Sequence, residues 1–247
     1  MPVDKNKSQA KFAAIIPVFN EEKAIRDMVE RTVKQISRLV VVNDGSTDQT
    51  SQQLADLPIE LISNSGNKGK AYSLWRGFHL LLESELEGII TLDGDGQHLP
   101  EDIPRVLAAY SEFPDHLIIG TRTHDLQSFP PSRRWANQMA NLGISLAAGC
   151  KVPDTQSGFR LYPTSLLRIL QSDSDQYSGF VFESEVIIKA ISLGYKIHSI
   201  PIAAVYGNQM RESHFRPAQD TIKIGKMIVG KIVSRLLKSV ANTLTKE

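Results

Sequence analysis

Short, almost wholly apolar runs alternate with longer amphipathic stretches along the first half of the chain. The apolar runs cover residues 11–18, 39–42, 59–62, 89–92 and 117–119. The amphipathic stretches cover residues 20–34, 71–82 and 100–110. The runs have the length and the β-branched content of strands, and continuous apolar strands are typical of a parallel sheet that is buried on both faces. The longer stretches predict helices.

The order of these elements predicts the fold class. Strands and helices alternate with short connections, which is typical of a doubly wound α/β domain with a mostly parallel central sheet flanked by helices. Asn20 is a favoured N-cap residue, and Glu21 and Glu22 would complement the helix dipole, so we expect the first helix to begin there. The first half of the chain therefore predicts a fold of the nucleotide-binding type.

A second pattern lies near the C-terminus, in residues 222–244. Apolar residues recur there at helical spacing: Val229, Ile232, Val233, Leu236, Leu237, Val240 and Leu244. Basic residues fall largely on the other side: Lys223, Lys231, Arg235 and Lys238. Such a basic amphipathic helix is too charged to span a bilayer and is typical of a segment that lies on an anionic membrane surface. Its apolar face would equally suit packing on the folded domain or on another subunit.

Composition and charge narrow the functional class. The chain has 247 residues and a formal net charge of +1, which argues against a nucleic-acid partner. Its one cysteine, Cys150, cannot form an internal disulfide and fits a reducing compartment. The polar N-terminus lacks the apolar core of a signal peptide, and no stretch is apolar for long enough to span a membrane. We therefore expect a cytoplasmic protein, with peripheral association at the inner membrane face as an option.

Two carboxylates directly follow the apolar run at residues 89–92. Asp93 and Asp95 stand one residue apart, with Gly94 between them. Ligands of open α/β sheets bind outside the carboxyl ends of the strands, and two acids this close repel each other unless a cation lies between them. A divalent metal such as Mg²⁺ or Mn²⁺ prefers oxygen ligands and brings substrate phosphates with it. The alternative is a solvated turn, since Asp and Gly both favour turns.

Two common nucleotide-binding motifs are missing from the sequence. No G-x-G-x-x-G follows the first predicted strand, and no G-x-x-x-x-G-K-[ST] occurs in the chain. These absences weigh against a dinucleotide dehydrogenase and against a P-loop NTPase. A nucleotide would have to be held through a metal ion and through side chains at the strand ends.

Several short segments together resemble a known family. Residues 16–21 (IPVFNE), 42–48 (VNDGSTD), 66–71 (GNKGKA) and 92–98 (LDGDGQH) occur in the order and spacing of family 2 glycosyltransferases of the GT-A fold. Residues 154–160 (DTQSGFR) resemble the segment that marks the dolichyl- or polyprenyl-phosphate mannosyltransferase branch. The resemblance spans residues 12–216. Together with the patterns described above, it predicts three parts: a flexible N-terminus at residues 1–11, a GT-A glycosyltransferase domain at 12–216 and a C-terminal basic amphipathic helix at 217–247.

The resemblance implies a donor site around the two carboxylates. In this family a divalent metal bridges the D-x-D carboxylates to the diphosphate of a nucleoside diphosphate sugar, and it stabilises charge on the leaving group. The implied metal ligands are Asp93, Asp95 and Gln97. The implied nucleotide-sugar-binding residues are Pro17, Phe19, Glu21, Asp44, Lys68, Gly69, Asp93 and Gly94. Turn formation is the alternative role for Asp44, and a solvated loop is the alternative for Lys68.

The resemblance also implies an acceptor site. The mannosyltransferase branch holds its acceptor phosphate with arginines, whose planar fork suits phosphate, and Arg122 and Arg133 match those positions. Asn137 stands where the branch has a serine, and Ser157 is a further candidate contact. A lipid phosphate is already charged and needs no strong base, whereas a sugar hydroxyl needs a carboxylate to remove its proton. Asp154 is the candidate base, although an Asp before a Thr also caps loops.

We therefore expect a metal-dependent, inverting glycosyltransferase that moves a sugar from a nucleoside diphosphate sugar to a polyprenyl phosphate. Inversion rests on the resemblance alone. The residues expected to act in catalysis are Asp95, Arg122, Arg133 and Asp154. Transfer to a glycan hydroxyl and a nucleotide-sugar-binding protein without turnover, docked to a membrane partner, are the alternatives. A nucleotidyltransferase fits less well, because the glycine-rich loop expected after the first strand is missing.

Overall fold

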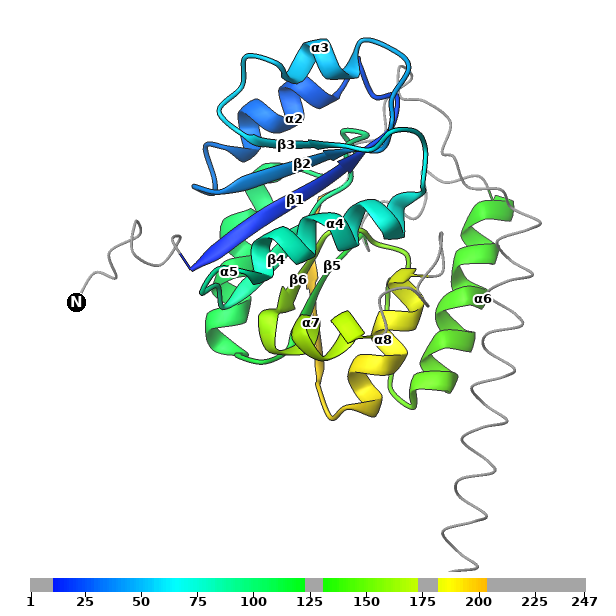
Figure 1. The fold of residues 1–247 in the computed structure, drawn as a ribbon. Coiled ribbons are helices and arrows are strands. Elements are labelled where there is room, and N and C mark those ends of the chain that lie inside the picture. The colour runs from blue at the N-terminus through cyan, green and yellow to red at the C-terminus, as the bar shows by residue number, and fades with distance from the viewer. Residues whose placement is uncertain (1–10, 123–130, 173–181, 204–247) are drawn as a thin grey trace, which may run out of the picture.

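A seven-stranded sheet lies at the centre of the computed structural model, which describes residues 11–122, 131–172 and 182–203 (Figure 1). The strands are β1 (Phe12–Val18), β2 (Leu39–Asn43), β3 (Glu60–Ser63), β4 (Gly88–Thr91), β5 (Leu117–Thr121), β6 (Arg160–Pro163) and β7 (Ile197–Pro201). Their spatial order is β3-β2-β1-β4-β6-β5-β7. Strands β1 to β4 pair in parallel, as does β5 with β7, so the predicted mostly parallel sheet is confirmed.

Strand β6 runs antiparallel between β4 and β5 and is the exception to this pattern. Its first residue, Arg160, is in register with Thr91 at the end of β4 and with Ile119 near the end of β5. The loop that leads into β6 therefore lies at the same sheet edge as the carboxyl ends of its neighbours. This reversal brings residues 154–159 beside the residues that follow β4 and β5.

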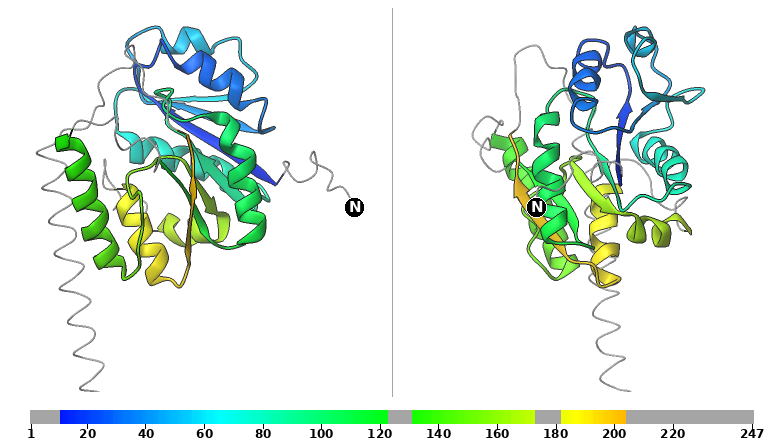
Figure 2. Two further views of the ribbon diagram at one scale, coloured as in Figure 1. Left: turned by 180° about the vertical axis from the view of Figure 1, so that it is seen from behind. Right: turned by 90° about the vertical axis from the view of Figure 1, so that its left-hand side faces the viewer.

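Helices cover both faces of the sheet (Figure 2). They are α2 (Ile25–Thr32), α3 (Thr50–Leu54), α4 (Lys70–Leu82), α5 (Ile103–Glu112), α6 (Pro131–Ala148), α7 (Thr164–Leu170) and α8 (Phe182–Ser192), with a short 3-10 turn η1 (Pro100–Asp102) before α5. Buried side chains of α4, α6, α7 and α8 form one core with the sheet, and those of α2, α3 and α5 form the other. The molecule is a three-layer α/β sandwich.

Strand β1 shows how the apolar runs build both cores. Its side chains alternate between the two faces of the sheet, as a strand requires, so Ile15 joins one core and Ile16 the other. All seven of its residues are buried, which explains why the run lacks polar alternation. Gly77 lets α4 approach closely, because a Cβ at this position would lie 2.9 Å from Cδ1 of Ile15.

The predicted start of the first helix is wrong. Helix α2 begins at Ile25, and its N-cap residue Ala24 makes no side-chain capping bond. Asn20 instead adopts a left-handed conformation with φ of 55°, and its side-chain oxygen accepts a hydrogen bond from the backbone N–H of Thr47. A contact between two strand-end loops therefore replaces the local cap that the sequence suggested.

The predicted division of the chain is only partly visible in the structure. Residues 1–10 and 204–247 lie outside the described residues, so the N-terminal segment and the amphipathic helix within 217–247 remain predictions. Among the helices in the described part of the chain, none is long and apolar enough to cross a membrane.

Candidate active site

The turn after β4 presents the two predicted carboxylates. Its conformation is held by its own polar groups, since the backbone N–H of Gln97 donates to Oδ1 of Asp95 at 3.0 Å. The backbone N–H of Asp93 donates to Nδ1 of the buried His98 at 3.2 Å. Gly96 takes a φ of 76°, a conformation that favours glycine. The D-x-D segment is thus a preformed turn at the carboxyl edge of the sheet.

Lys70 joins this turn to two helices. It is the first residue of α4, and its Nζ lies 2.5 Å from Oδ1 of Asp93 and 2.7 Å from Oε1 of Glu183. Glu183 belongs to the first turn of α8, and its side chain is only 6% exposed. The Lys70 and Asp93 side chains are 24% and 26% exposed. One ammonium group therefore neutralises two carboxylates that come from distant parts of the chain.

The two carboxylates of the turn differ in their electrostatic setting. Burial alone would raise the pKa of Asp93, but the positive charge of the neighbouring Lys70 lowers it to about 2. Burial and the negative charge of Asp93 instead raise the pKa of Asp95. Burial lowers the pKa of His98, which favours the neutral imidazole. Asp95 is therefore the carboxylate that a further cation would stabilise most.

The residues present suit a hard divalent cation whose coordination is completed by a ligand. Asp93 and Asp95 supply hard carboxylate oxygens, which Mg²⁺ and Mn²⁺ prefer. Within the described residues no cluster of three or more His, Cys, Asp or Glu side chains could hold a metal ion. Mg²⁺ is commonly bound by one or two carboxylates together with substrate phosphates and water. The donor set fits this kind of shared site.

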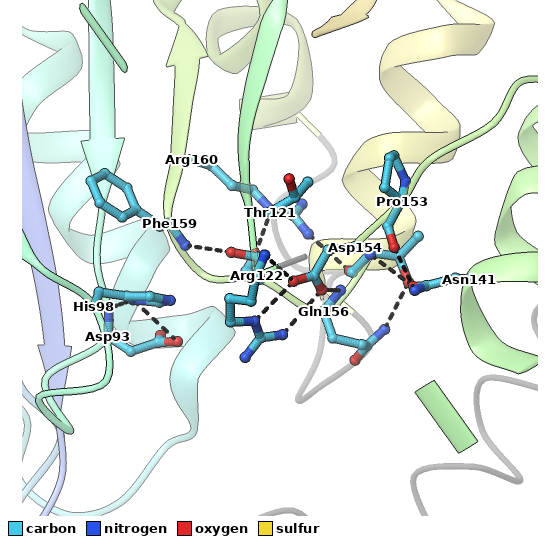
Figure 3. Close-up of polar contacts among 12 residues, drawn as sticks. Asp93, His98, Thr121, Arg122, Asn141, Pro153, Asp154, Gln156, Phe159 and Arg160 are labelled. Atoms are coloured by element: carbon cyan, nitrogen blue, oxygen red, sulfur yellow. Dashed lines mark hydrogen bonds and ion pairs between the residues drawn. The ribbon is translucent and has the colours of Figure 1, made fainter. Parts of the chain in front are cut away.

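Arg122 and Asp154 form a second charged pair beside the turn (Figure 3). Nε and one Nη of Arg122 donate to the two oxygens of Asp154 at 2.8 and 3.0 Å. The backbone N–H of Arg122 donates to the same carboxylate at 3.3 Å. Figure 3 shows Arg122 between Asp154 and the pair formed by Asp93 and His98. Asp154 thus orients the arginine that follows β5.

This pairing argues against Asp154 as a general base. Burial opposes ionisation of its carboxyl group, but the contact with Arg122 lowers its pKa below the usual value. A carboxylate of lowered pKa that is held by a guanidinium accepts a proton poorly. The structure therefore favours an orienting role for Asp154 over the base role that the sequence suggested.

The loop before β6 packs directly against the D-x-D turn. A Cβ on Gly158 would lie 2.4 and 2.5 Å from the two carboxylate oxygens of Asp93, so only glycine permits this approach. The fully buried Arg160 donates to the backbone carbonyls of Thr155, Ser157 and Glu183 at 2.7 to 2.9 Å. Arg160 thereby ties the loop to the start of α8.

Asp44, which was predicted to bind the nucleotide sugar, anchors the loop that precedes α4. Its Oδ1 accepts from the side chain of Asn64 at 2.6 Å and from the backbone N–H of Lys68 at 2.9 Å. Its Oδ2 accepts from the backbone N–H of Gly69 at 2.7 Å. The side chain of Lys68 is exposed, and Lys70 is the lysine of this loop that reaches the carboxylates. Nucleotide contacts by Asp44, Lys68 and Gly69 stay predictions.

The remaining donor candidates lie where β1 meets the D-x-D turn. Pro17 is buried in β1, while Phe19 and Glu21 follow the strand and are half-buried. A Cβ on Gly94 would lie 3.3 Å from the carbonyl oxygen of Pro17, so the turn packs closely on the end of β1. The structure brings these four residues to one edge of the sheet, and their contacts with a donor stay predictions.

The acceptor candidates are less fully described. Arg133 and Asn137 belong to helix α6, but their side chains lie outside the described part of the structure. Ser157 is fully buried, and its Oγ accepts a hydrogen bond from the backbone N–H of Phe159 at 3.3 Å. This burial gives Ser157 a role in closing the loop and argues against direct contact with an acceptor in this conformation.

Three residues of the site are absent from the sequence-based predictions. Glu183 lies in no quoted motif and reaches the site only through the fold. Gly158 and Arg160 stand inside the quoted segment 154–160, but nothing in their spacing indicated a contact with Asp93 or with α8. Their contacts span tens of residues along the chain, which local patterns do not report.

A comparison with protein families gives the site its context. The sequence pattern of the family described as Glycosyl transferase family 2 matches residues 13–170, which include the D-x-D turn, the Lys70 loop and Arg160. The chain belongs to glycosyl transferase family 2. The family 2 assignment that the motifs implied is thereby confirmed, and with it the enzyme class, glycosyltransferase.

Two similar proteins are named as enzymes that transfer sugars to lipid phosphates. The chain is 29% identical over 216 residues to UDP-N-acetylglucosamine--dolichyl-phosphate N-acetylglucosaminyltransferase of Methanococcus voltae, covering 78% of this chain and 84% of that protein. It is 26% identical over 201 residues to undecaprenyl-phosphate mannosyltransferase of Micrococcus luteus, covering 77% and 82%. The resemblance to the polyprenyl-phosphate branch is therefore confirmed at the level of sequence.

A solved structure confirms the fold. Glucosyl-3-phosphoglycerate synthase from Mycobacterium tuberculosis, crystallised with Mn²⁺, uridine diphosphate and glucosyl-3-phosphoglycerate, superposes with a TM-score of 0.66. The match covers 95% of this chain and 85% of that one at 17% identity. The family 2 chain therefore has the predicted GT-A fold.

Proposed function

We propose that this family 2 enzyme transfers a sugar from a nucleoside diphosphate sugar to a polyprenyl phosphate, with inversion and with Mg²⁺ or Mn²⁺ as cofactor. The observation that carries the proposal is the position of Arg122, which Asp154 orients beside the D-x-D turn. An arginine fork suits a phosphate acceptor, and the neighbouring carboxylates suit a metal-bound donor. The site thus has a place for each of two phosphorylated substrates.

On the donor side, Asp93, Asp95 and Gln97 would hold the metal. When bound, the ion would neutralise charge that develops on the departing nucleoside diphosphate. The hydrogen bond from the backbone N–H of Gln97 to Asp95 holds the D-x-D turn in place before the donor binds. The carboxylates therefore need little reorganisation when the donor binds. Two similar proteins are named as transferases that use UDP-N-acetylglucosamine or act on undecaprenyl phosphate, which supports this donor and acceptor chemistry.

On the acceptor side, a lipid phosphate fits the site better than a sugar hydroxyl. The oxygen of a phosphate carries negative charge near neutral pH and attacks without prior loss of a proton. Among the described residues, the carboxylate that pairs with Arg122 is Asp154, and its lowered pKa makes it a poor base. Arg122 would bind and orient the phosphate, with Arg133 and Asn137 as further predicted contacts. Transfer to a glycan hydroxyl is the less favoured alternative.

The exposed surface of helix α6 is a further argument for an acceptor that is embedded in a lipid bilayer. Three large apolar side chains at helical spacing, Met139, Leu142 and Leu146, are 47%, 54% and 61% exposed on its outer face. No charged residue occurs between Trp135 and Lys151. An exposed uncharged face of this kind suits a lipid surface. The predicted amphipathic segment at residues 222–244 would add a second contact at the inner membrane face.

Helix α6 is also linked to the proposed acceptor site. The side chain of Asn141 donates to the carbonyl of Pro153 at 2.7 Å and accepts from the backbone N–H of Thr155 at 2.9 Å. These bonds hold both neighbours of Asp154, which in turn orients Arg122. An apolar helix face and a phosphate-binding arginine are therefore parts of one connected structure.

The experiment that tests the function measures donor consumption by the purified full chain. GDP-mannose, UDP-glucose and UDP-N-acetylglucosamine are each supplied with Mn²⁺ or Mg²⁺, with and without a short polyprenyl phosphate. Release of one nucleoside diphosphate that requires both metal and lipid phosphate is expected. Consumption that requires a glycan acceptor instead would contradict the lipid-phosphate assignment. Binding of a donor without any consumption would indicate the non-catalytic alternative.

A further inference from the structure

The contact between Lys70 and Asp93 creates a conflict at the proposed metal site. Lys70 Nζ lies 2.5 Å from Oδ1 of Asp93, so a cation already occupies one of the two predicted metal-binding carboxylates. A divalent ion on Asp93 would meet the charge of this ammonium at close range. Two positive charges repel each other strongly in a partly buried site, where water screens them little.

Glu183 offers a way to resolve the conflict. Its Oε1 lies 2.7 Å from the same ammonium group, and its side chain is 6% exposed. The backbone of Glu183 is held by Arg160, and the hydroxyl of the next residue, Ser184, accepts from Gln156 at 3.1 Å. Glu183 is thus a rigidly placed carboxylate that keeps Lys70 paired if Asp93 takes another partner.

We propose that Lys70 is an exchangeable counter-ion of Asp93, which the metal-bound nucleoside diphosphate displaces and which Glu183 then retains. The proposal rests on the proposed function, since it assumes a metal-dependent donor site. Before the donor binds, Lys70 is paired with Asp93, and its positive charge weakens the binding of a bare divalent ion. After the donor binds, its phosphates supply the negative charge that allows the metal ion and Lys70 to lie near each other.

The inference predicts that metal and nucleotide bind cooperatively. With two carboxylates and a competing ammonium, the free protein should bind Mn²⁺ weakly, and UDP or GDP should raise the affinity for Mn²⁺ by about 100-fold. By reciprocity, Mn²⁺ should raise the affinity for the nucleotide by the same factor. Lys70 and Glu183 are positioning residues in this scheme.

The test titrates Mn²⁺ into the full chain and follows free Mn²⁺ by electron paramagnetic resonance, with and without UDP or GDP. Lys70→Met should raise the affinity for Mn²⁺ alone by about tenfold and reduce the cooperativity, because the competing cation is gone. Glu183→Gln should lower the affinity for Mn²⁺ in the presence of nucleotide by about tenfold, because Lys70 then keeps its contact with Asp93. Lys70→Arg, which retains the charge, should bind Mn²⁺ alone as weakly as the wild type.

The opposite signs of these two effects separate exchange from a merely structural role. If Lys70 and Glu183 only stabilised the fold, both variants would weaken binding together with thermal stability, and that result would overturn the inference. Equal Mn²⁺ affinity for wild type and Lys70→Met without nucleotide would overturn it as well. If Mn²⁺ and nucleotide bind cooperatively but neither variant changes this, the exchange of Lys70 is refuted while the proposed function stands. If Mn²⁺ does not bind with either nucleotide, the proposed metal-dependent function is refuted as well.

Discussion

The two sides of the site are built in different ways. The proposed donor side consists of residues at or shortly after the carboxyl ends of the parallel strands β1, β2, β3 and β4. The proposed acceptor side surrounds the antiparallel strand β6 and draws Arg122, Asp154 and α6 from separate segments. The donor side can therefore be located from motifs at the strand ends, whereas the acceptor side can be located only from contacts between segments that are far apart in the chain.

This difference teaches where the sequence is informative. In a parallel sheet every strand delivers its following turn to the same edge, so a short motif predicts its own location. An antiparallel strand such as β6 instead brings the loop that precedes it to that edge. No local sequence pattern predicts that a strand is reversed. Variants on the two sides should accordingly fail in different ways.

The largest effect is expected on the donor side from Asp95→Asn. Loss of this carboxylate removes a predicted metal ligand and should lower sugar transfer about 10³-fold at saturating Mn²⁺. The measurement is release of nucleoside diphosphate together with formation of the lipid-linked sugar. Asp56→Asn, at an exposed carboxylate whose side chain is 66% exposed, is the matched control and should stay close to the wild-type rate. A fully active Asp95→Asn enzyme would contradict the metal-binding role.

Gly158→Ala tests the contact between the two sides. The added Cβ would lie 2.4 Å from Oδ2 of Asp93 and must displace a carboxylate that Lys70 holds in place. We expect kcat/KM for the donor to fall about 100-fold, because a small misplacement of a catalytic group is costly. Gly66→Ala is the control, since a Cβ there meets nothing within 4 Å. Equal activity of the two variants would show that the loop before β6 tolerates movement.

The ion pair on the acceptor side predicts a pH-dependent stability. The pKa of Asp154 is lower in the folded protein than its usual value of 3.8, so the stabilisation is fully present above about pH 4 and is lost as pH falls through the lowered pKa. Asp154→Asn should cost about 3 kcal/mol of unfolding free energy at pH 7. The deficit should shrink below pH 4. Urea unfolding at several pH values checks this, and a deficit that is constant down to pH 2 would contradict it.

The same variant separates an orienting role of Asp154 from a role as base. If Asp154 orients Arg122, Asp154→Asn should raise KM for the polyprenyl phosphate about tenfold and change kcat less. Loss of a general base would instead lower kcat by two or more orders of magnitude, on the order of 10²–10⁴. Steady-state kinetics at varied lipid concentration distinguish the two outcomes.

The smallest effect is expected from the outer face of α6. Leu142→Glu places a charge on this exposed apolar stripe and should weaken binding to anionic vesicles about fivefold. Turnover of a short, water-soluble prenyl phosphate should be unaffected. Leu61→Glu makes the same exchange at a 39% exposed leucine on β3, at the far edge of the sheet. If both variants bind vesicles equally, α6 does not contact lipid.

Much of the donor side followed from the sequence because its signals are local. The apolar runs predicted β1 to β5, and the pair Asp93 and Asp95 was placed at the correct sheet edge. The family motifs implied the GT-A fold, which the family match and the superposition confirm. The error at Asn20 has the opposite cause, since its side chain bonds to Thr47 and not to its own helix.

The sequence alone therefore determines the set of strands β1 to β5, the acidic turn and the family to which the chain belongs. The partners of those residues depend on the folded chain. Lys70 meets Glu183 across more than a hundred residues, Gly158 meets Asp93 because β6 is reversed, and Asp154 holds Arg122 rather than acting alone. Periodicity and motifs report contacts within a few residues, whereas charge pairing and close packing depend on distance in space, which only the assembled sheet establishes.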